Sequence, residues 1–359
     1  MWEIKVGLLL LAMEIMNVSS NTLGKAAMAK GLSNYIFTTY THGVAFLFLI
    51  PIAFLFHRKN PAPPISIGII LRLCLLGVLC GGCSIFLYIG IRYSSPTLAS
   101  ATNNLSPAFT FIMGIIFRME VLNLRNESSI LKSVGTIISI GGAFIVTLYQ
   151  GMAITIFPAS PTESSLSSLL IIESDIQPNW TFGGLFLVFS CIFLSLSYVA
   201  KTWIARDFNS EILITLISFF FETIFAASVT LLAETDTSVW TPTLGIEIIA
   251  LLFGALEVGV VNTVQTWACG KKGPLFVAMF KPLQMIIAVI LGVSFLGDVL
   301  HLGSLIGGTI IAIGFYTVMK GKSEEESKKE VDESRFIYSS DDDSSPHKLP
   351  LLPNQIQSV

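Results

Sequence analysis

Ten apolar segments follow one another along the chain, separated by shorter stretches that hold most of its charged residues. A membrane-spanning helix needs about 20 mostly apolar residues, and the segments are of this length. Each must satisfy its own backbone hydrogen bonds in lipid, which favours helices over the short alternating strands of a barrel. We therefore predict an all-α polytopic membrane protein. The predicted spans cover about residues 5–24, 35–56, 68–91, 96–117, 131–150, 182–203, 211–233, 244–268, 274–297 and 302–319.

The second half of the chain repeats the first. Residues 96–124 align with residues 274–302 without a gap, so that Pro96 falls on Pro274. Each copy holds five predicted spans, and because five is odd, the two copies enter the bilayer in opposite directions. Two inverted five-helix repeats are an architecture of secondary transporters, which bind substrate where the halves meet.

Composition changes at the ends of the two repeats and divides the chain into four parts. We expect a first repeat over residues 1–150, an extracytosolic loop over 151–180, a second repeat over 181–320 and a disordered acidic cytosolic tail over 321–359. The loop is rich in Ser and Pro, and the tail has too little apolar surface to fold. Overall the chain is 53% hydrophobic and 13% charged, which is typical of membrane proteins.

Positive charge is distributed unevenly between the two sides. With the N-terminus inside, the inner loops and the tail collect most Lys and Arg residues, whereas residues 151–180 and 234–243 contain none. Cytosolic loops carry an excess of Lys and Arg, so we expect both termini to be cytosolic. The net charge of −3 gives no reason to expect a nucleic-acid partner.

Charged and amide side chains inside the spans are the candidate functional residues, because each is costly at membrane depth unless it is paired or hydrated. In the first span, Glu14, Asn17 and Asn21 share one helical face with Lys25. The repeat pairs Asn103 of the fourth span with Lys281 of the ninth, so the halves differ at one symmetric position. The candidate substrate-binding residues are Lys281, Glu257, Asn103, Gln284, Gln265, Glu14, Asn17 and Asn21.

These polar faces predict a hydrated cavity lined by spans one, three or four, six, eight and nine. In such a cavity Lys281 can meet a substrate carboxylate, whereas Glu14 or Glu257 can meet an ammonium group or carry a proton. Pro107 and Pro282 interrupt the helical hydrogen-bond ladder, so we expect helix kinks that turn free carbonyl groups toward the cavity.

Salt bridges between helices are the alternative role for these charges. We prefer that role for Glu222 and Lys25, and for Lys281 and Glu257 both roles stay open. Two further cations, Arg72 and Lys201, lie near the cytosolic ends of their spans. Their long side chains can reach the interface from there, so we expect them to snorkel.

The sequence contains no motif for catalysis or metal binding. It has neither H-E-x-x-H nor G-x-S-x-G, and its four histidines are scattered. The five cysteines lie in or at the ends of spans, and the C-x-x-C of residues 80–83 is more typical of close helix packing than of a metal site. We expect no enzyme activity, no cofactor and no metal. A transport-inactive scaffold or receptor is a further function class.

Six motifs together resemble one family. They are Ser95-Pro96-Thr97-Leu98-Ala99-Ser100-Ala101, Asn104-Leu105-Ser106-Pro107-Ala108, Thr266-Trp267-Ala268, Lys272-Gly273-Pro274, Phe280-Lys281-Pro282-Leu283 and Phe295-Leu296-Gly297-Asp298. Over residues 5–320 the chain resembles plant drug/metabolite transporter superfamily members with two EamA domains, the nodulin-21-like or walls-are-thin-related proteins. That group includes the usually-multiple-acids-move-in-and-out amino-acid transporters. Many relatives carry Asn where this chain has Lys281, so the resemblance does not identify a particular substrate.

The resemblance implies ten spans, cytosolic termini, and export or bidirectional movement of amino acids or related small organic acids. Auxin or another plant metabolite is the alternative substrate. We expect a transporter that works by alternating access, with a small organic solute and the lipid bilayer as its partners and protons as a further candidate. The plasma membrane is favoured over the vacuolar membrane. Substrate identity, direction, ion coupling and oligomeric state stay open.

Overall fold

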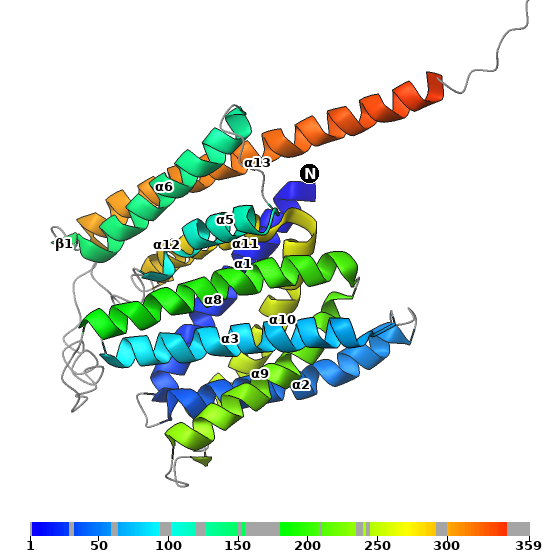
Figure 1. Cartoon of the computed structure of the whole chain (residues 1–359). Helices are drawn as coiled ribbons and strands as arrows, with labels where there is room; N and C mark the ends of the chain where they lie inside the picture. The colour runs from blue at the N-terminus through cyan, green and yellow to red at the C-terminus, as the bar shows by residue number, and fades with distance from the viewer. Residues whose placement is uncertain are drawn as a thin grey trace, which may run out of the picture.

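The computed structural model describes eleven stretches of the chain, and helices occupy all ten positions predicted to span the membrane (Figure 1). The described residues are 2–28, 32–58, 64–93, 102–119, 126–149, 153–154, 180–208, 210–234, 240–241, 245–291 and 300–342. The helices are α1 (Trp2–Met28), α2 (Asn34–His57), α3 (Ile67–Tyr93), α5 (Ser106–Ile116), α6 (Glu127–Leu148), α8 (Trp180–Asp207), α9 (Glu211–Ala233), α10 (Ile246–Lys272), α11 (Pro274–Ala278), α12 (Lys281–Leu291) and α13 (Leu302–Asp342). The predicted fold class is confirmed.

Packing between the helices follows the inverted repeat. Helix α2 packs along α9 and α6 along α13, which pairs each helix with its repeat equivalent. Helix α1 packs against α10 and α12, just as its equivalent α8 packs against α3 and α5. The N-terminus and the far end of α13 lie on the same side of the bundle (Figure 1). The two halves therefore have the two-fold relation that the sequence repeat requires.

The ninth span is broken in its middle. Helix α11 ends at Ala278, and α12 begins at Lys281 after a short turn. Pro282 lies in the first turn of α12, and Pro107 lies in the first turn of α5. A proline is tolerated there because the amide N–H that it lacks would have no intrahelical partner. Both prolines thus follow an interruption and begin a helix, instead of bending a continuous one as expected.

Glycines allow α6 and α13 to approach closely. A Cβ atom on Gly314 would lie 2.5 Å from the backbone nitrogen of Ser139, and one on Gly142 would lie 2.7 Å from that of Ile311. Such distances leave no room for a side chain, so the backbones are nearly in contact. The glycines in the last span of each half thus serve close helix packing.

The tail differs from the expected disorder over its first part. Helix α13 continues through residues 321–342, whereas residues 343–359 lie outside the described part of the chain. Glu325 anchors the start of this extension, since its carboxylate lies 2.7 Å from Nζ of Lys132, a residue of α6 that is only 1% exposed. Glu and Lys are good helix formers, and Glu324 and Glu325, each followed four positions later by a Lys residue in the sequence, support helix formation.

The remaining connections are small. Strand β1 (Ala153–Ile154) pairs antiparallel with β2 (Leu300–His301), which joins the start of the interrepeat loop to the start of α13. Residues 151–152 and 155–179 of the predicted loop lie outside the described part, as does the side chain of Lys25.

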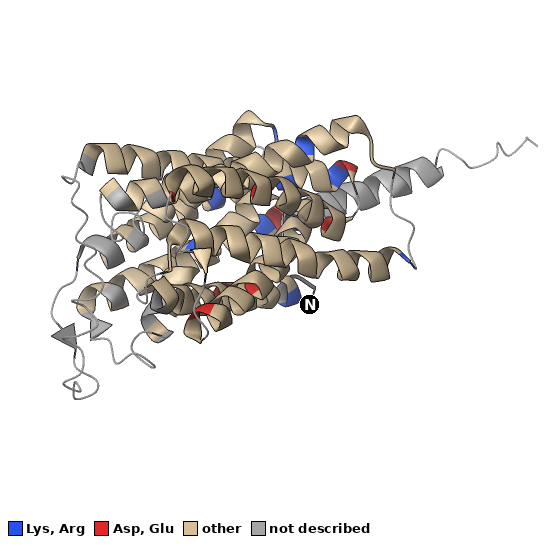
Figure 2. Cartoon of the chain, turned by 90° about the horizontal axis from the view of Figure 1, so that it is seen from below, with Lys and Arg blue, Asp and Glu red and all other residues tan. Residues whose placement is uncertain are grey.

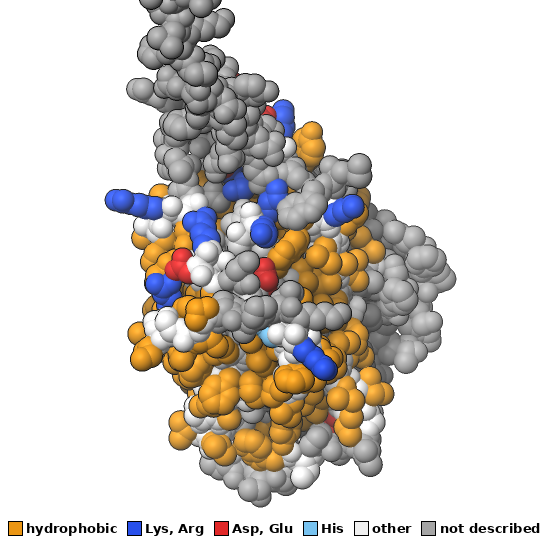
Figure 3. Space-filling view, turned by 90° about the vertical axis from the view of Figure 1, so that its right-hand side faces the viewer, with side chains coloured by type: hydrophobic (Ala, Val, Ile, Leu, Met, Phe, Trp, Pro, Cys, Tyr) orange, Lys and Arg blue, Asp and Glu red, His pale blue; other side chains and the backbone are white. Residues whose placement is uncertain are grey.

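The outside of the bundle is apolar. Six of the described helices are long and apolar enough to cross a membrane, namely α1, α2, α3, α8, α9 and α10. Large side chains such as Ile67 and Leu71 are 87% and 72% exposed, which suits contact with lipid. Lys and Arg residues concentrate toward the end of the bundle from which α13 projects (Figure 2). The view onto that end shows them gathered there above the hydrophobic surface (Figure 3).

Candidate substrate site

An ion pair joins the two halves in the middle of the bundle. Nζ of Lys281 lies 3.4 Å from Oε1 of Glu14 and 3.5 Å from its Oε2. The Glu14 side chain is 4% exposed and that of Lys281 is 16% exposed. Lys281 is the first residue of α12, so the break in the ninth span places its ammonium group beside α1. Two residues predicted independently on different repeats are thus direct partners.

A ladder of amides continues this contact by one helical turn. Nε2 of Gln284 donates a hydrogen bond to Oδ1 of Asn17 over 2.6 Å. Nδ2 of Asn21 donates to the same oxygen over 2.9 Å. Asn17 follows Glu14 by three positions, and Gln284 follows Lys281 by three positions, so the polar faces of α1 and α12 are in register.

Glu257 lies next to this pair on α10. It is 6% exposed and interacts electrostatically with both Lys281 and Glu14. Its carboxylate is within hydrogen-bonding reach of Ser20 on α1. Three of the predicted charges therefore lie in one region, where the ammonium group of Lys281 pairs with Glu14 and also interacts with Glu257.

Gln265 belongs to a second polar contact on α10. Nζ of Lys201 donates hydrogen bonds to Oδ1 of Asn262 over 2.8 Å and to Oε1 of Gln265 over 3.5 Å. Lys201 is 4% exposed, so the expected snorkelling is wrong for this residue. Its helix turns the side chain toward α10 instead of the interface. Arg72 does lie at the surface, where it pairs with Asp207.

Asn103 occupies the equivalent position in the other half. Its Oδ1 lies 3.7 Å from Sγ of Cys191 on α8. Helix α5 packs against α8 as α12 packs against α1, so equivalent helices meet beside Asn103 and beside Lys281. The two halves thus share the helix packing, but only one of them has an ion pair at this position.

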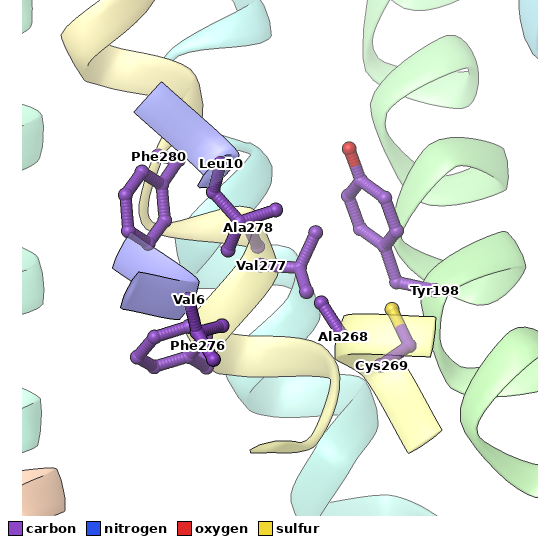
Figure 4. Close-up of a cluster of buried hydrophobic side chains, with 9 residues drawn as sticks. All are labelled: Val6, Leu10, Tyr198, Ala268, Cys269, Phe276, Val277, Ala278 and Phe280. Carbon is purple, nitrogen blue, oxygen red and sulfur yellow. The ribbon is translucent and has the colours of Figure 1, made fainter. Parts of the chain in front are cut away.

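Tyr198 is a residue of this region that the sequence did not indicate. It is 1% exposed, and its ring packs with Val277 and Ala268 in an apolar cluster formed by α1, α8, α10 and α11 (Figure 4). Its hydroxyl points away from that cluster and has no hydrogen-bond partner among the described residues. Tyr198 interacts electrostatically with Lys281 and Glu14. A buried, unpaired hydroxyl beside an ion pair is well placed to bind a polar ligand.

Glu222 and His42 form a further buried pair, between α9 and α2. Nε2 of His42 lies 3.1 Å from Oε1 of Glu222. Glu222 is thus paired across two helices, whereas its preference for a structural over a functional role stays a prediction, and His42 was not singled out. No local signal in the sequence indicates that two helices so far apart along the chain meet at these residues.

The inverted halves and the buried charges between them define a membrane protein of the secondary-transporter class. Residues 4–148 match the model described as the EamA-like transporter family. Three WAT1-related proteins of Arabidopsis thaliana are 43%, 37% and 37% identical to the chain. The alignments cover 96%, 88% and 89% of this chain and 94%, 89% and 87% of theirs. The chain belongs to the EamA-like transporter family, among its WAT1-related members.

The same architecture is found in a solved crystal structure. It superposes on this chain with a TM-score of 0.65 and covers 89% of this chain and 98% of its own. The sequence identity is 13%, so the likeness concerns the fold.

Proposed function

We propose that the protein moves amino acids or related small organic acids across the membrane by alternating access. The observation that carries this proposal is the buried Glu14–Lys281 pair, which links the two repeats. An amino acid carries a carboxylate and an ammonium group, the same two charges as the pair. Its carboxylate can take the place of Glu14 beside Lys281, and its ammonium group can bind Glu14 and Glu257.

This exchange of partners avoids leaving a buried charge alone. Removing one partner of a buried ion pair costs about 3–5 kcal/mol, because the other charge stays in a low-dielectric environment without compensation. A zwitterion supplies a new partner to each side at once, so the contact between the halves can open when the substrate is bound. In its absence the pair holds α1 and α12 together. Opening of the contact between the two halves is thereby linked to substrate binding, as alternating access requires.

The orientation and the membrane are parts of the same proposal. The concentration of Lys and Arg at the end where α13 projects supports cytosolic termini (Figure 3). Export and bidirectional movement are both compatible with this orientation, and the plasma membrane is the location that we propose.

Auxin or another carboxylated aromatic metabolite is the second candidate substrate. It is favoured by the buried ring and unpaired hydroxyl of Tyr198 near Lys281. Such a ligand has a carboxylate but no ammonium group. It therefore needs Lys281 but not the carboxylate of Glu14.

Purified protein in liposomes tests both candidates. Counterflow of labelled amino acids and of labelled auxin is measured for the wild type, Glu14→Gln and the control Arg72→Met, which alters an ion pair at the surface. An amino-acid transporter loses most counterflow in Glu14→Gln, whereas an auxin transporter retains it. Wild-type protein that moves neither class of solute overturns the proposal and leaves a scaffold or receptor role.

A further inference from the structure

The His42–Glu222 pair is separate from the contacts of the proposed substrate site. Its side chains are 11% and 6% exposed and come from α2 and α9. The ring of Phe219 packs edge-on against the imidazole of His42, with 5.7 Å between centroids. These contacts hold the pair in an apolar environment at membrane depth, where an ionisable group is a candidate functional site.

The hydrogen-bond geometry fixes how many protons the pair holds. Nδ1 of His42 lies 2.7 Å from the carbonyl oxygen of Thr38, which can only accept a hydrogen bond, so Nδ1 carries a proton. Nε2 lies 3.1 Å from Oε1 of Glu222, and two bare acceptors at this distance would repel each other. One more proton must therefore lie in this contact, on the imidazole or on the carboxyl group. The pair binds one proton that it can lose.

Other titratable groups face the pair from the neighbouring helices. Glu257 on α10 interacts electrostatically with His42 as well as with Lys281, and so connects this pair with the substrate site. On α3, Cys80 interacts with Glu222. On α1, Ser20 is within reach of the Glu257 carboxylate.

The buried charges balance when the pair holds its proton. Around the two pairs, three buried carboxylates face one buried lysine and one lysine that is 16% exposed. The carboxylates are those of Glu14, Glu222 and Glu257, and the lysines are Lys201 and Lys281. The Lys132–Glu325 pair adds no net charge, and Glu247 lies in the first turn of α10, at the end of the bundle. Since a net charge at membrane depth is costly, one proton at His42–Glu222 makes this interior neutral.

A small cavity leads away from the carboxylate. It has about 10 Å³ of water-accessible space, roughly that needed by one water molecule, and it lies between α2, α3 and α9. Glu222 lines it together with the hydroxyl-bearing residues Tyr35, Ser84 and Thr230. Tyr35 is in the first turn of α2 and Thr230 in the last turn of α9, so the cavity extends toward the end of the bundle that we expect to be extracytosolic.

We propose that the His42–Glu222 pair is a proton-binding site of the transport cycle, loaded from the extracytosolic side through this cavity. The proton passes between water and the pair, with no other bond made or broken. Glu257 interacts with both His42 and Lys281, so a proton on the pair affects the charges that bind a zwitterionic solute at Glu14–Lys281, and the solute and the proton are bound together and move in the same direction. This coupling rests on the proposed function, but proton binding itself does not.

An infrared pH titration of the purified protein tests proton binding without transport. The variants are His42→Gln, Glu222→Gln and the double variant, which keeps a neutral amide pair. His57→Gln is the matched control, because His57 lies on the same helix and contacts the carbonyl oxygen of Ala53 but meets the hydroxyl of Ser210 instead of a carboxylate. We expect the double variant to lose one buried titrating group that the control retains. A titration identical to that of the control overturns the proposal.

Liposomes test the coupling. With acid outside, one proton carried per solute lets the wild type accumulate labelled solute up to about tenfold per pH unit, since one pH unit corresponds to 1.36 kcal/mol. Glu222→Gln should give no accumulation above the outside concentration and yet retain counterflow at equal pH. Coupling through this pair is overturned if solute accumulation by the wild type does not depend on the pH gradient. It is also overturned if Glu222→Gln accumulates solute to the wild-type level. Absence of counterflow in the wild type instead refutes the proposed function, and the titration still decides on proton binding.

Discussion

Replacing Lys281 with methionine removes the ammonium group and keeps a side chain of similar length. The carboxylate of Glu14, 4% exposed, then has no cation within ion-pair distance among the described residues. Breaking a buried pair in this way costs about 3–5 kcal/mol, whereas replacing both partners by neutral groups of similar size is close to neutral or stabilising. For a chain of 359 residues that loss lowers the melting temperature by about 4–7 °C.

A double-mutant cycle measures this coupling. Melting temperatures in detergent are recorded for Lys281→Met, Glu14→Gln and the double variant, with Arg72→Met as the control because its partly exposed pair contributes no more than about 1 kcal/mol. We expect the double variant to regain most of the stability lost by Lys281→Met and to show no amino-acid counterflow. Additive losses would refute the argument that the pair is held together in the empty protein.

Three other changes test the packing and the buried polar groups. Gly314→Leu should lower the free energy of unfolding by about 1–3 kcal/mol, because its Cβ would meet the backbone of α6. Gly141→Leu is the control, because a Cβ there has open space around it. Size-exclusion profiles recorded after heating compare the stability of the two variants. Tyr198→Phe should leave the melting temperature equal or higher, since it removes a buried hydroxyl without a partner, but should weaken solute binding measured by calorimetry. Deleting residues 322–359 removes the carboxylate that pairs with the buried lysine of α6 and should lower the melting temperature, whereas deleting 343–359 should not.

Periodicity in the sequence identified which faces of the spans are polar, but not which faces meet. The spacing of Glu14 and Asn17 places them on one face of the first span. Lys281 and Gln284 have the same spacing, and each contacts one of the two residues. The match itself depends on how distant helices pack, and that information is not local. The prediction for Lys201 was wrong for the same reason. The position of a residue along a span does not show whether its side chain turns toward the membrane interface or toward a neighbouring helix.

The break in the ninth span was also only partly predictable. Pro282 indicated an interruption, but a proline is equally compatible with a kink or with the start of a new helix. Packing of α11 against α5 and α8 decides between them, and it leaves Lys281 at a helix start.

The continuity of α13 has a mechanical consequence. The last span and the segment beyond it form a single helix, and residues 321–342 extend it by about 30 Å at 1.5 Å per residue. If the last span tilts, this segment moves with it as a rigid extension beyond the contact of Glu325 with α6. A tilt of about 10° would swing the far end by about 5 Å, given its length at 1.5 Å per residue. Movement inside the bilayer would thereby produce a larger displacement on the side where the tail emerges.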